Sequence, residues 1–126
     1  MSWQSYVDDQ LIKTGKVQKA AILGQAGGVW ATSTGYNLSP EEQRAVIAGF
    51  KDLATIQASG VRLGSQKFFT LSASDRSVYG KKGPDGCILV KTKQAILVAE
   101  YVAPIQQPEA VNVVEKLADY LISVGY

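Results

Sequence analysis

The chain has 126 residues, 46% of them hydrophobic and 19% charged, a composition that fits one ordinary globular domain. Its formal net charge of +2 is too weak to indicate a nucleic-acid-binding protein. The sequence has no histidine and a single cysteine, Cys87, which excludes a histidine general base, a histidine or multi-cysteine zinc site and an intramolecular disulfide.

The N-terminal residues lack the charged start and apolar run of a secretory signal. No segment approaches the roughly 20 apolar residues of a membrane span, so we expect a cytoplasmic protein.

Ser2 can cap a first helix that ends near Gly15. The residues at helical spacing in this segment are Trp3, Tyr6, Val7 and Leu11. The first two lie so close to the chain end that little protein remains to cover them.

Two short apolar segments, 19–23 and 29–33, are joined through a glycine-rich link, and this pattern predicts a β-hairpin. Strand alternation would place Trp30 on one face of the hairpin and Val29 with Ala31 on the other.

The next segment carries a strong helix start. Ser39 can act as the N-cap, Pro40 suits the first helical position, and Glu42 completes a capping box. The buried stripe of this helix is predicted to be Val46, Ile47 and Phe50.

After a short helical or irregular piece through Ile56, the chain becomes β-rich. The predicted strands are Gly60–Leu63, Lys67–Ala73, Ser77–Lys81, Cys87–Lys91 and Ala95–Tyr101. Turn residues at 82–86 and a tight connection at 91–94 indicate a meander of antiparallel strands. The stretch 95–99 is apolar on both faces, which is typical of a central strand covered on both sides. Cys87 is predicted to be a small buried hydrophobic residue.

An amphipathic helix is predicted from Glu109 to Tyr126, with Pro108 suited to its first turn. Its apolar stripe is Ala110, Val113, Val114, Leu117, Ala118 and Leu121. The expected fold is a single α+β domain over residues 1–126. It has a central antiparallel sheet of about six or seven strands, with the N- and C-terminal helices on one face and the middle helix on the other.

Several stretches of this sequence resemble profilin, the small actin-monomer-binding family. The strongest are the opening 2–8 (Ser-Trp-Gln-Ser-Tyr-Val-Asp), the strand 75–81 (Asp-Arg-Ser-Val-Tyr-Gly-Lys) and the ending 117–121 (Leu-Ala-Asp-Tyr-Leu) with a terminal Tyr126. Together with weaker matches they span the whole chain in the order seen in the family, and the sequence looks most like the short profilins of fungi. The resemblance implies a non-enzymatic regulator of actin polymerisation that needs no cofactor or metal.

Aromatic residues from three distant parts of the sequence would converge if the two terminal helices lie side by side. An exposed aromatic groove is a standard receptor for a polyproline II helix, and the resemblance to profilin implies the same surface. The predicted polyproline-binding residues are Trp3, Tyr6, Trp30, Tyr120, Leu121 and Tyr126. The ligands implied are proline-rich segments of actin assembly factors such as formins. The alternative is that these aromatics only close the core.

The resemblance also implies an actin-facing surface made of meander strands and the outward side of the last helix. Its predicted residues are Lys67, Ser72, Arg76, Tyr79, Lys81, Lys91, Lys93, Asn112, Glu115 and Lys116. Ser72 stands where profilins often carry an arginine, so one charge-assisted contact is absent. The alternative is a solvated sheet face whose charges suppress edge pairing.

Basic residues could also meet anionic lipid headgroups, and the resemblance implies reversible binding to phosphatidylinositol bisphosphate at the membrane surface. The predicted residues are Arg62, Arg76, Lys81 and Lys82.

We expect the protein to be a monomer and to have no nucleic-acid partner.

Two other classes of protein fit the sequence less well. An enzyme is disfavoured because the sequence has no histidine, no glycine-rich phosphate loop and no nucleophile elbow. A sensory or trafficking module of similar architecture fits in size, but its pocket would need buried polar groups where the apolar strand 96–98 leaves little room.

Overall fold

The computed structural model describes residues 2–126 and has one curved, fully antiparallel sheet of seven strands. The strand order is β2-β1-β7-β6-β5-β4-β3, so neighbours in the sheet are mostly neighbours in sequence. The strands are β1 (Lys19–Gly24), β2 (Val29–Thr32), β3 (Val61–Leu63), β4 (Gln66–Ala73), β5 (Ser77–Lys82), β6 (Asp85–Lys91) and β7 (Ala95–Tyr101). The predicted hairpin and meander are confirmed, with ends that differ by one or two residues.

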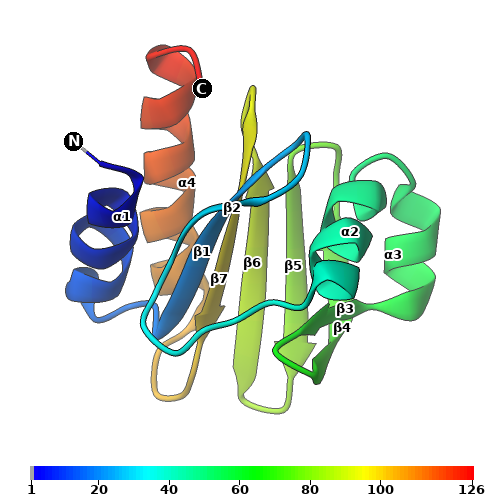
Figure 1. The fold of residues 1–126 in the computed structure, drawn as a ribbon. Coiled ribbons are helices and arrows are strands. Elements are labelled where there is room, and N and C mark those ends of the chain that lie inside the picture. The colour runs from blue at the N-terminus through cyan, green and yellow to red at the C-terminus, as the bar shows by residue number, and fades with distance from the viewer. Residues whose placement is uncertain (1) are drawn as a thin grey trace.

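Helices cover both faces of the sheet, and each face has its own hydrophobic core. The N-terminal segment packs beside α4 (Gln107–Ser123) on one face, as Figure 1 shows, and α2 (Pro40–Gly49) with α3 (Leu53–Ser59) covers the other. The predicted arrangement of terminal helices on one face and the middle helix on the other is confirmed. Within residues 2–126, no helix is long and apolar enough to cross a bilayer.

The N-terminal segment is one continuous helical stretch of changing pitch. It begins as α1 (Trp3–Ser5), widens into the π-helix η1 (Tyr6–Leu11) and tightens into the 3₁₀ turn η2 (Ile12–Thr14). The Ser2 hydroxyl accepts a hydrogen bond from the Ser5 amide, which confirms the predicted cap. Apolar spacing predicts a helix here but cannot separate a π turn from an α turn, because both place residues four apart on one side.

Helix α4 starts close to its predicted position but ends earlier, at Ser123 rather than at the last residue. Gly125 adopts a positive φ of 95°, which turns the chain away from the helix axis. The tail is then held by the turn between β6 and β7. Thr92 Oγ and the Gln94 amide both donate to the Tyr126 carbonyl, and Gln94 Nε2 donates to the Gly125 carbonyl. This latch fixes where the terminal aromatic lies.

The β1–β2 hairpin contains a bulge that the alternation rule misses. Leu23 pairs with Val29, but Ile22 pairs with Ala31, so Trp30 is the extra residue in β2. Residues paired across strands project from the same face, which places Val29 and Ala31 on opposite faces. The prediction that these two share a face is therefore wrong, and the bulge aims Trp30 toward α1.

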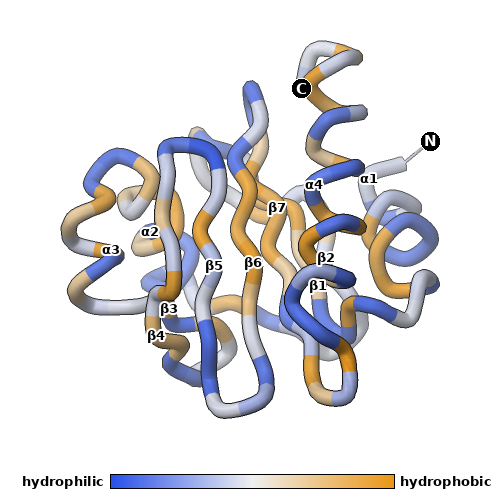
Figure 2. The backbone as a smooth tube through the Cα atoms, turned by 180° about the vertical axis from the view of Figure 1, so that it is seen from behind, coloured by the Kyte–Doolittle hydropathy of each residue, from blue (hydrophilic) through white to orange (hydrophobic). Residues whose placement is uncertain are grey.

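The interior strand β7 is buried along its whole length, as predicted for a central strand. Figure 2 shows hydrophobic residues, in orange, along much of β6 and β7. Cys87 is buried, as predicted, and burial raises the pKa of its thiol. Glu100 is also buried, with 5% of its surface exposed, and its Oε2 atom has no hydrogen-bond partner. Burial raises the pKa of this carboxyl group.

Coverage of the sheet is unequal. Helix α4 packs against β6 and β7, and α1 lies beside β2, but neither packs on β3 or β4. The side of β3 and β4 that faces the α4 layer is therefore left without a covering helix. The sheet thus offers an open region next to α4.

Candidate functional site: an aromatic trough and an open sheet face

Five aromatic rings meet near the start of α1 and the end of α4, two segments that lie side by side in Figure 1. Trp3 is at their centre. Its ring centroid lies 4.7 Å from Trp30, 5.0 Å from Tyr126 and 5.4 Å from Tyr6, while Tyr6 lies 6.1 Å from Tyr120. These separations and tilted orientations are those of favourable aromatic pairs. We call this cluster the aromatic trough.

Backbone features hold two of the segments that carry these rings, the β2 segment with Trp30 and the C-terminal tail with Tyr126. The bulge in β2 brings Trp30 across Gly24, where an added Cβ atom would lie 2.6 Å from the indole nitrogen. The β6–β7 turn holds the carbonyl groups of Gly125 and Tyr126. Because these two segments are fixed independently of the N-terminal helix that carries Trp3 and Tyr6, the rings form a preorganised surface.

The rings remain accessible to a ligand. Tyr120 is 50% exposed and Tyr126 is 42% exposed, while the other three rings are half-buried. Leu121 differs from the rest of the predicted set, because it has no exposed surface and belongs to the core beneath α4. It supports the trough from below and does not line it.

The trough also carries hydrogen-bond donors. The pKa of Tyr6 is raised by loss of hydration and by the neighbouring hydroxyl of Tyr120. The Tyr6 phenol is therefore protonated at neutral pH and can donate to a carbonyl group. Indole N–H groups on the two tryptophans supply further donors. The surface thus combines flat apolar walls with donors, which suits a ligand rich in rings and free carbonyls.

A groove continues from the trough between η1 and α4. It has a volume of about 550 Å³. Tyr6 and Tyr120 form its upper end, the side chains of Val113 and Leu117 supply apolar walls, and Gln10, Thr14 and Lys116 add polar groups.

The open sheet face carries a second group of exposed side chains. Lys67 pairs with Arg62, and Phe69 pairs with Lys81, so these four project from one face. Ser72 joins them because it pairs with Tyr79. That face is the α4 side, since the Tyr79 hydroxyl donates to Glu115 of α4.

Sequence reasoning missed two apolar residues on this part of the sheet. Phe69 is 69% exposed, and Leu71, at a bulge in β4, is 54% exposed. The Lys67 ammonium group lies 5.5 Å from the centroid of the Phe69 ring. The adjacent pair Phe68-Phe69 was the available signal, because neighbouring strand residues point to opposite faces and only Phe68 reaches a core.

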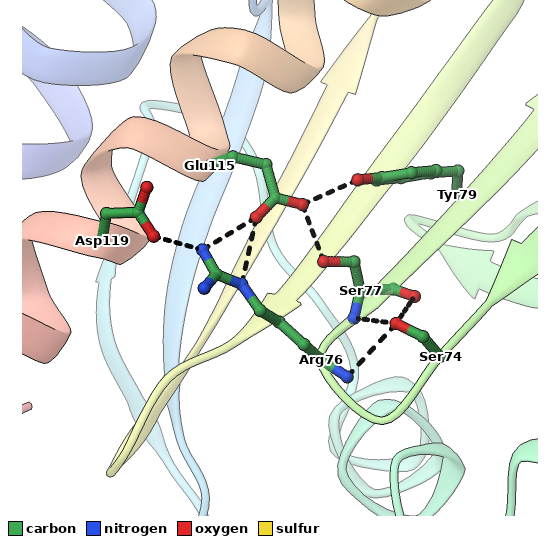
Figure 3. A network of polar contacts seen from close by, with 6 residues as sticks. All are labelled: Ser74, Arg76, Ser77, Tyr79, Glu115 and Asp119. Atoms are coloured by element: carbon green, nitrogen blue, oxygen red, sulfur yellow. Dashed lines mark hydrogen bonds and ion pairs between the residues drawn. The ribbon is translucent and has the colours of Figure 1, made fainter.

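A polar network joins β5 to α4 beside the open face (Figure 3). Glu115 accepts hydrogen bonds from the hydroxyls of Ser77 and Tyr79, each at 2.7 Å, and pairs with Arg76. The Arg76 guanidinium also lies 2.7 Å from Asp119, and the hydrogen bond to Asp119, followed by the charge of Glu115, raises the pKa of Arg76. We call these five residues the Glu115 network. It ties the last helix to the sheet.

The structure separates the ten predicted actin-binding residues. Lys67, Ser72 and Lys81 share the open face, whereas Arg76, Tyr79 and Glu115 belong to the Glu115 network, so the prediction that Glu115 faces outward is wrong. Asn112 is exposed one turn before Glu115, and Lys93 is exposed in the β6–β7 turn. Two residues lie elsewhere, because Lys91 lies 6.0 Å from the Phe50 ring on the α2 side and Lys116 lines the groove beside η1.

The predicted lipid-binding residues are also divided. Arg62 and Lys81 share the open face with Lys67. Lys82 points to the opposite side, where its ammonium group bonds Gln66 at 3.1 Å. Arg76 is engaged by two carboxylates. The basic patch on the open face is therefore Arg62, Lys67 and Lys81.

Comparison with known proteins matches the chain to one family. The family model described as Profilin matches residues 1–126. The chain is 52% identical to Profilin-2 of Acanthamoeba castellanii over 126 residues, and 48% identical to the fungal profilin of Schizosaccharomyces pombe over 127, with the full length of each chain covered.

Solved structures agree. Acanthamoeba castellanii profilin IB superposes with a TM-score of 0.96 at 50% identity, covering 99% of this chain and 100% of that one. Mouse profilin IIa, solved in complex with a double repeat from the FH1 domain of mDia1, has the same fold, with a TM-score of 0.81 at 23% identity over the whole of both chains. The sequence resemblance is thereby confirmed, and the chain belongs to the profilin family.

Proposed function

We propose that this protein is a stoichiometric regulator of actin assembly that holds an actin monomer on its open sheet face and binds proline-rich segments in its aromatic trough. The observation that carries the proposal is the trough itself. In it, five partly exposed rings from three segments meet where the N- and C-terminal segments lie side by side. Family membership supports both partners. No bond is made or broken, so the activity is binding alone.

The trough fits a polyproline II helix for physical reasons. Such a helix is already extended, so it loses little conformational entropy on binding, and its pyrrolidine rings stack on flat aromatic walls. Its carbonyl groups have no internal partners, and the Tyr6 hydroxyl and the tryptophan N–H groups can donate to them. Proline-rich segments of assembly factors such as formins are the proposed ligands.

The open sheet face is the proposed site for monomeric actin. It combines exposed apolar area with positive charge, and interfaces of standard size bury about 800 Å² on each partner. The proposed contacts are Lys67, Phe69, Leu71, Ser72, Lys81 and Asn112. Arg76, Tyr79 and Glu115 support this face by fixing α4 against β5.

The two surfaces occupy different regions, so both partners can be held together. An actin monomer bound to a profilin that is itself tethered to a proline-rich segment has a raised local concentration at the assembly factor. Such a role places the protein in the cytoplasm with the actin cytoskeleton. The patch formed by Arg62, Lys67 and Lys81 supports reversible contact with phosphatidylinositol bisphosphate, which would compete with actin for the same face.

Retention of the pure protein on a polyproline column tests the proposal. Wild-type protein should be retained, and Tyr6→Asp should pass through because a charged carboxylate replaces one of the five rings of the trough, the one that lies between Trp3 and Tyr120. Circular dichroism of the variant checks that it is folded. A folded wild-type protein that is not retained would contradict the assignment. Binding of monomeric actin, measured separately, tests the second surface.

A further inference from the structure

The groove between η1 and α4 extends the aromatic trough toward Thr14 and carries a charge that the proline-binding role leaves unexplained. Lys116 lies at this groove and is exposed. The part of the chain that the structure describes provides no ion-pair partner for its ammonium group.

Nearby carboxylates are occupied elsewhere. Asp119, one turn along α4, pairs with Arg76 on the sheet side of the helix. On the N-terminal segment, Asp9 pairs with Lys13, and Asp8 accepts a hydrogen bond from Gln4. None of these carboxylates lies within ion-pair distance of the Lys116 ammonium group.

The dimensions of the groove suit a short continuation of an extended ligand. Val113 to Tyr120 spans seven residues of α-helix, or about 10 Å at 1.5 Å per residue. A polyproline II chain advances about 3.1 Å per residue, so about three residues cover this distance. A chain leaving the trough past Tyr6 and Tyr120 enters the groove directly.

We propose that this groove binds the residues that flank the proline stretch of a ligand, and that Lys116 selects an acidic side chain within about three residues of the last proline. The inference rests on the proposed function of the trough and adds a specificity determinant to it. Val113 and Leu117 make apolar contacts with the flanking residues of the ligand. Gln10 and Thr14 can form hydrogen bonds with the polar backbone groups of those residues. The partner class is therefore a proline-rich segment bordered by aspartate or glutamate.

Synthetic peptides test the inference by calorimetry or tryptophan fluorescence. Decaproline is compared with decaproline flanked by three glutamates and with decaproline flanked by three glutamines, with each flank placed at either end because a polyproline helix can bind in two directions. At low ionic strength the acidic flank at one end should tighten binding about two- to fivefold over the glutamine flank, as for a partly exposed ion pair. High ionic strength should reduce the gain.

Variants of the protein locate the effect. Lys116→Gln should abolish the preference without changing the affinity for plain decaproline, and Lys116→Glu should reverse it. Lys51→Gln, which removes an exposed lysine remote from the groove, is the matched control and should keep the preference. Equal affinity for the acidic and glutamine flanks, or a preference that survives Lys116→Gln, would overturn the inference. Failure of every peptide to bind, including decaproline, would instead overturn the function of the trough.

Discussion

The aromatic trough and the open sheet face differ in how their side chains are held. In the trough, the ring of Trp3 contacts three other rings, and those rings come from separate segments. On the sheet face, side chains project from one side of a sheet, and Phe69 is 69% exposed, with the Lys67 ammonium group over its ring. The trough is therefore a cooperative unit, in which one change disturbs several contacts. On the sheet face, each substitution should affect only the contacts of the residue that is changed.

The largest effect should come from Trp3→Ala. Loss of the central ring removes stacking surface and frees Trp30, Tyr6 and Tyr126 to move, so polyproline affinity should fall about thirtyfold or more. Calorimetric titration with decaproline measures this. Val124→Ala, which removes a different exposed apolar side chain of the C-terminal region, is the control and should have little effect. A Trp3→Ala protein with wild-type affinity would show that the trough is not the proline site.

Phe69→Ala should weaken binding of monomeric actin about tenfold, the effect of truncating one large apolar contact at an interface. Because the ring is mostly exposed, thermal stability and decaproline affinity should not change. Val102→Ala, at another exposed apolar residue outside the open face, serves as the control. If Phe69→Ala also reduced decaproline binding, the two surfaces would not be independent.

Glu115→Gln should lower the free energy of unfolding by about 1–2 kcal/mol, because the amide loses the charge that pairs with Arg76. If the amide oxygen accepts from the two hydroxyls, its NH2 group faces the Arg76 guanidinium, which has no acceptor to offer. Urea denaturation measures the change. Since the Glu115 network lies beside the open face and away from the trough, decaproline affinity should stay at its wild-type value. A stability equal to that of wild type would mean that the network does not hold α4 to the sheet.

Glu100→Gln should have the opposite sign, because this carboxylate is buried without a partner for one of its oxygens. A carboxyl group whose pKa is raised in the folded state costs stability as the pH rises through and above its unfolded value, which is about 4.3. The stabilisation by Gln should therefore be small near pH 4 and grow toward pH 7. Urea titrations at both pH values measure it, and a gain confined to low pH would contradict the assignment.

The contrast between the two surfaces also explains what sequence could predict. The trough is predictable because Trp3, Tyr6 and Tyr126 lie near chain ends that two amphipathic helices bring together, and helical spacing is visible in sequence. The direction of Trp30 is not predictable, because it depends on one extra residue in β2 that the composition of the strand does not reveal.

The sheet face was predicted less completely. Its strands were identified, but whether a polar residue faces a helix, a partner strand or solvent depends on how far α4 extends over the sheet. Glu115 and Lys116 are neighbours in sequence, yet one bonds β5 and the other lines the groove beside η1. A rule that treats every polar helix residue as outward-facing cannot distinguish the environment of Glu115 from that of Lys116. The exposure of Phe69 is likewise not apparent from sequence, because its neighbours in the strand are also apolar.

The smallest effect should come from the latch that positions Tyr126. Gln94→Ala removes the side-chain hydrogen bond to the Gly125 carbonyl but leaves the backbone bond from residue 94 and the Thr92 hydroxyl bond in place. The Tyr126 ring should remain near Trp3 with more freedom, and decaproline affinity should fall about two- to threefold. Gln18→Ala, which removes an amide side chain bound to the Val102 N–H far from the trough, is the matched control. A loss as large as that of Trp3→Ala would mean that backbone attachment of the tail, more than stacking on Trp3, holds the trough together.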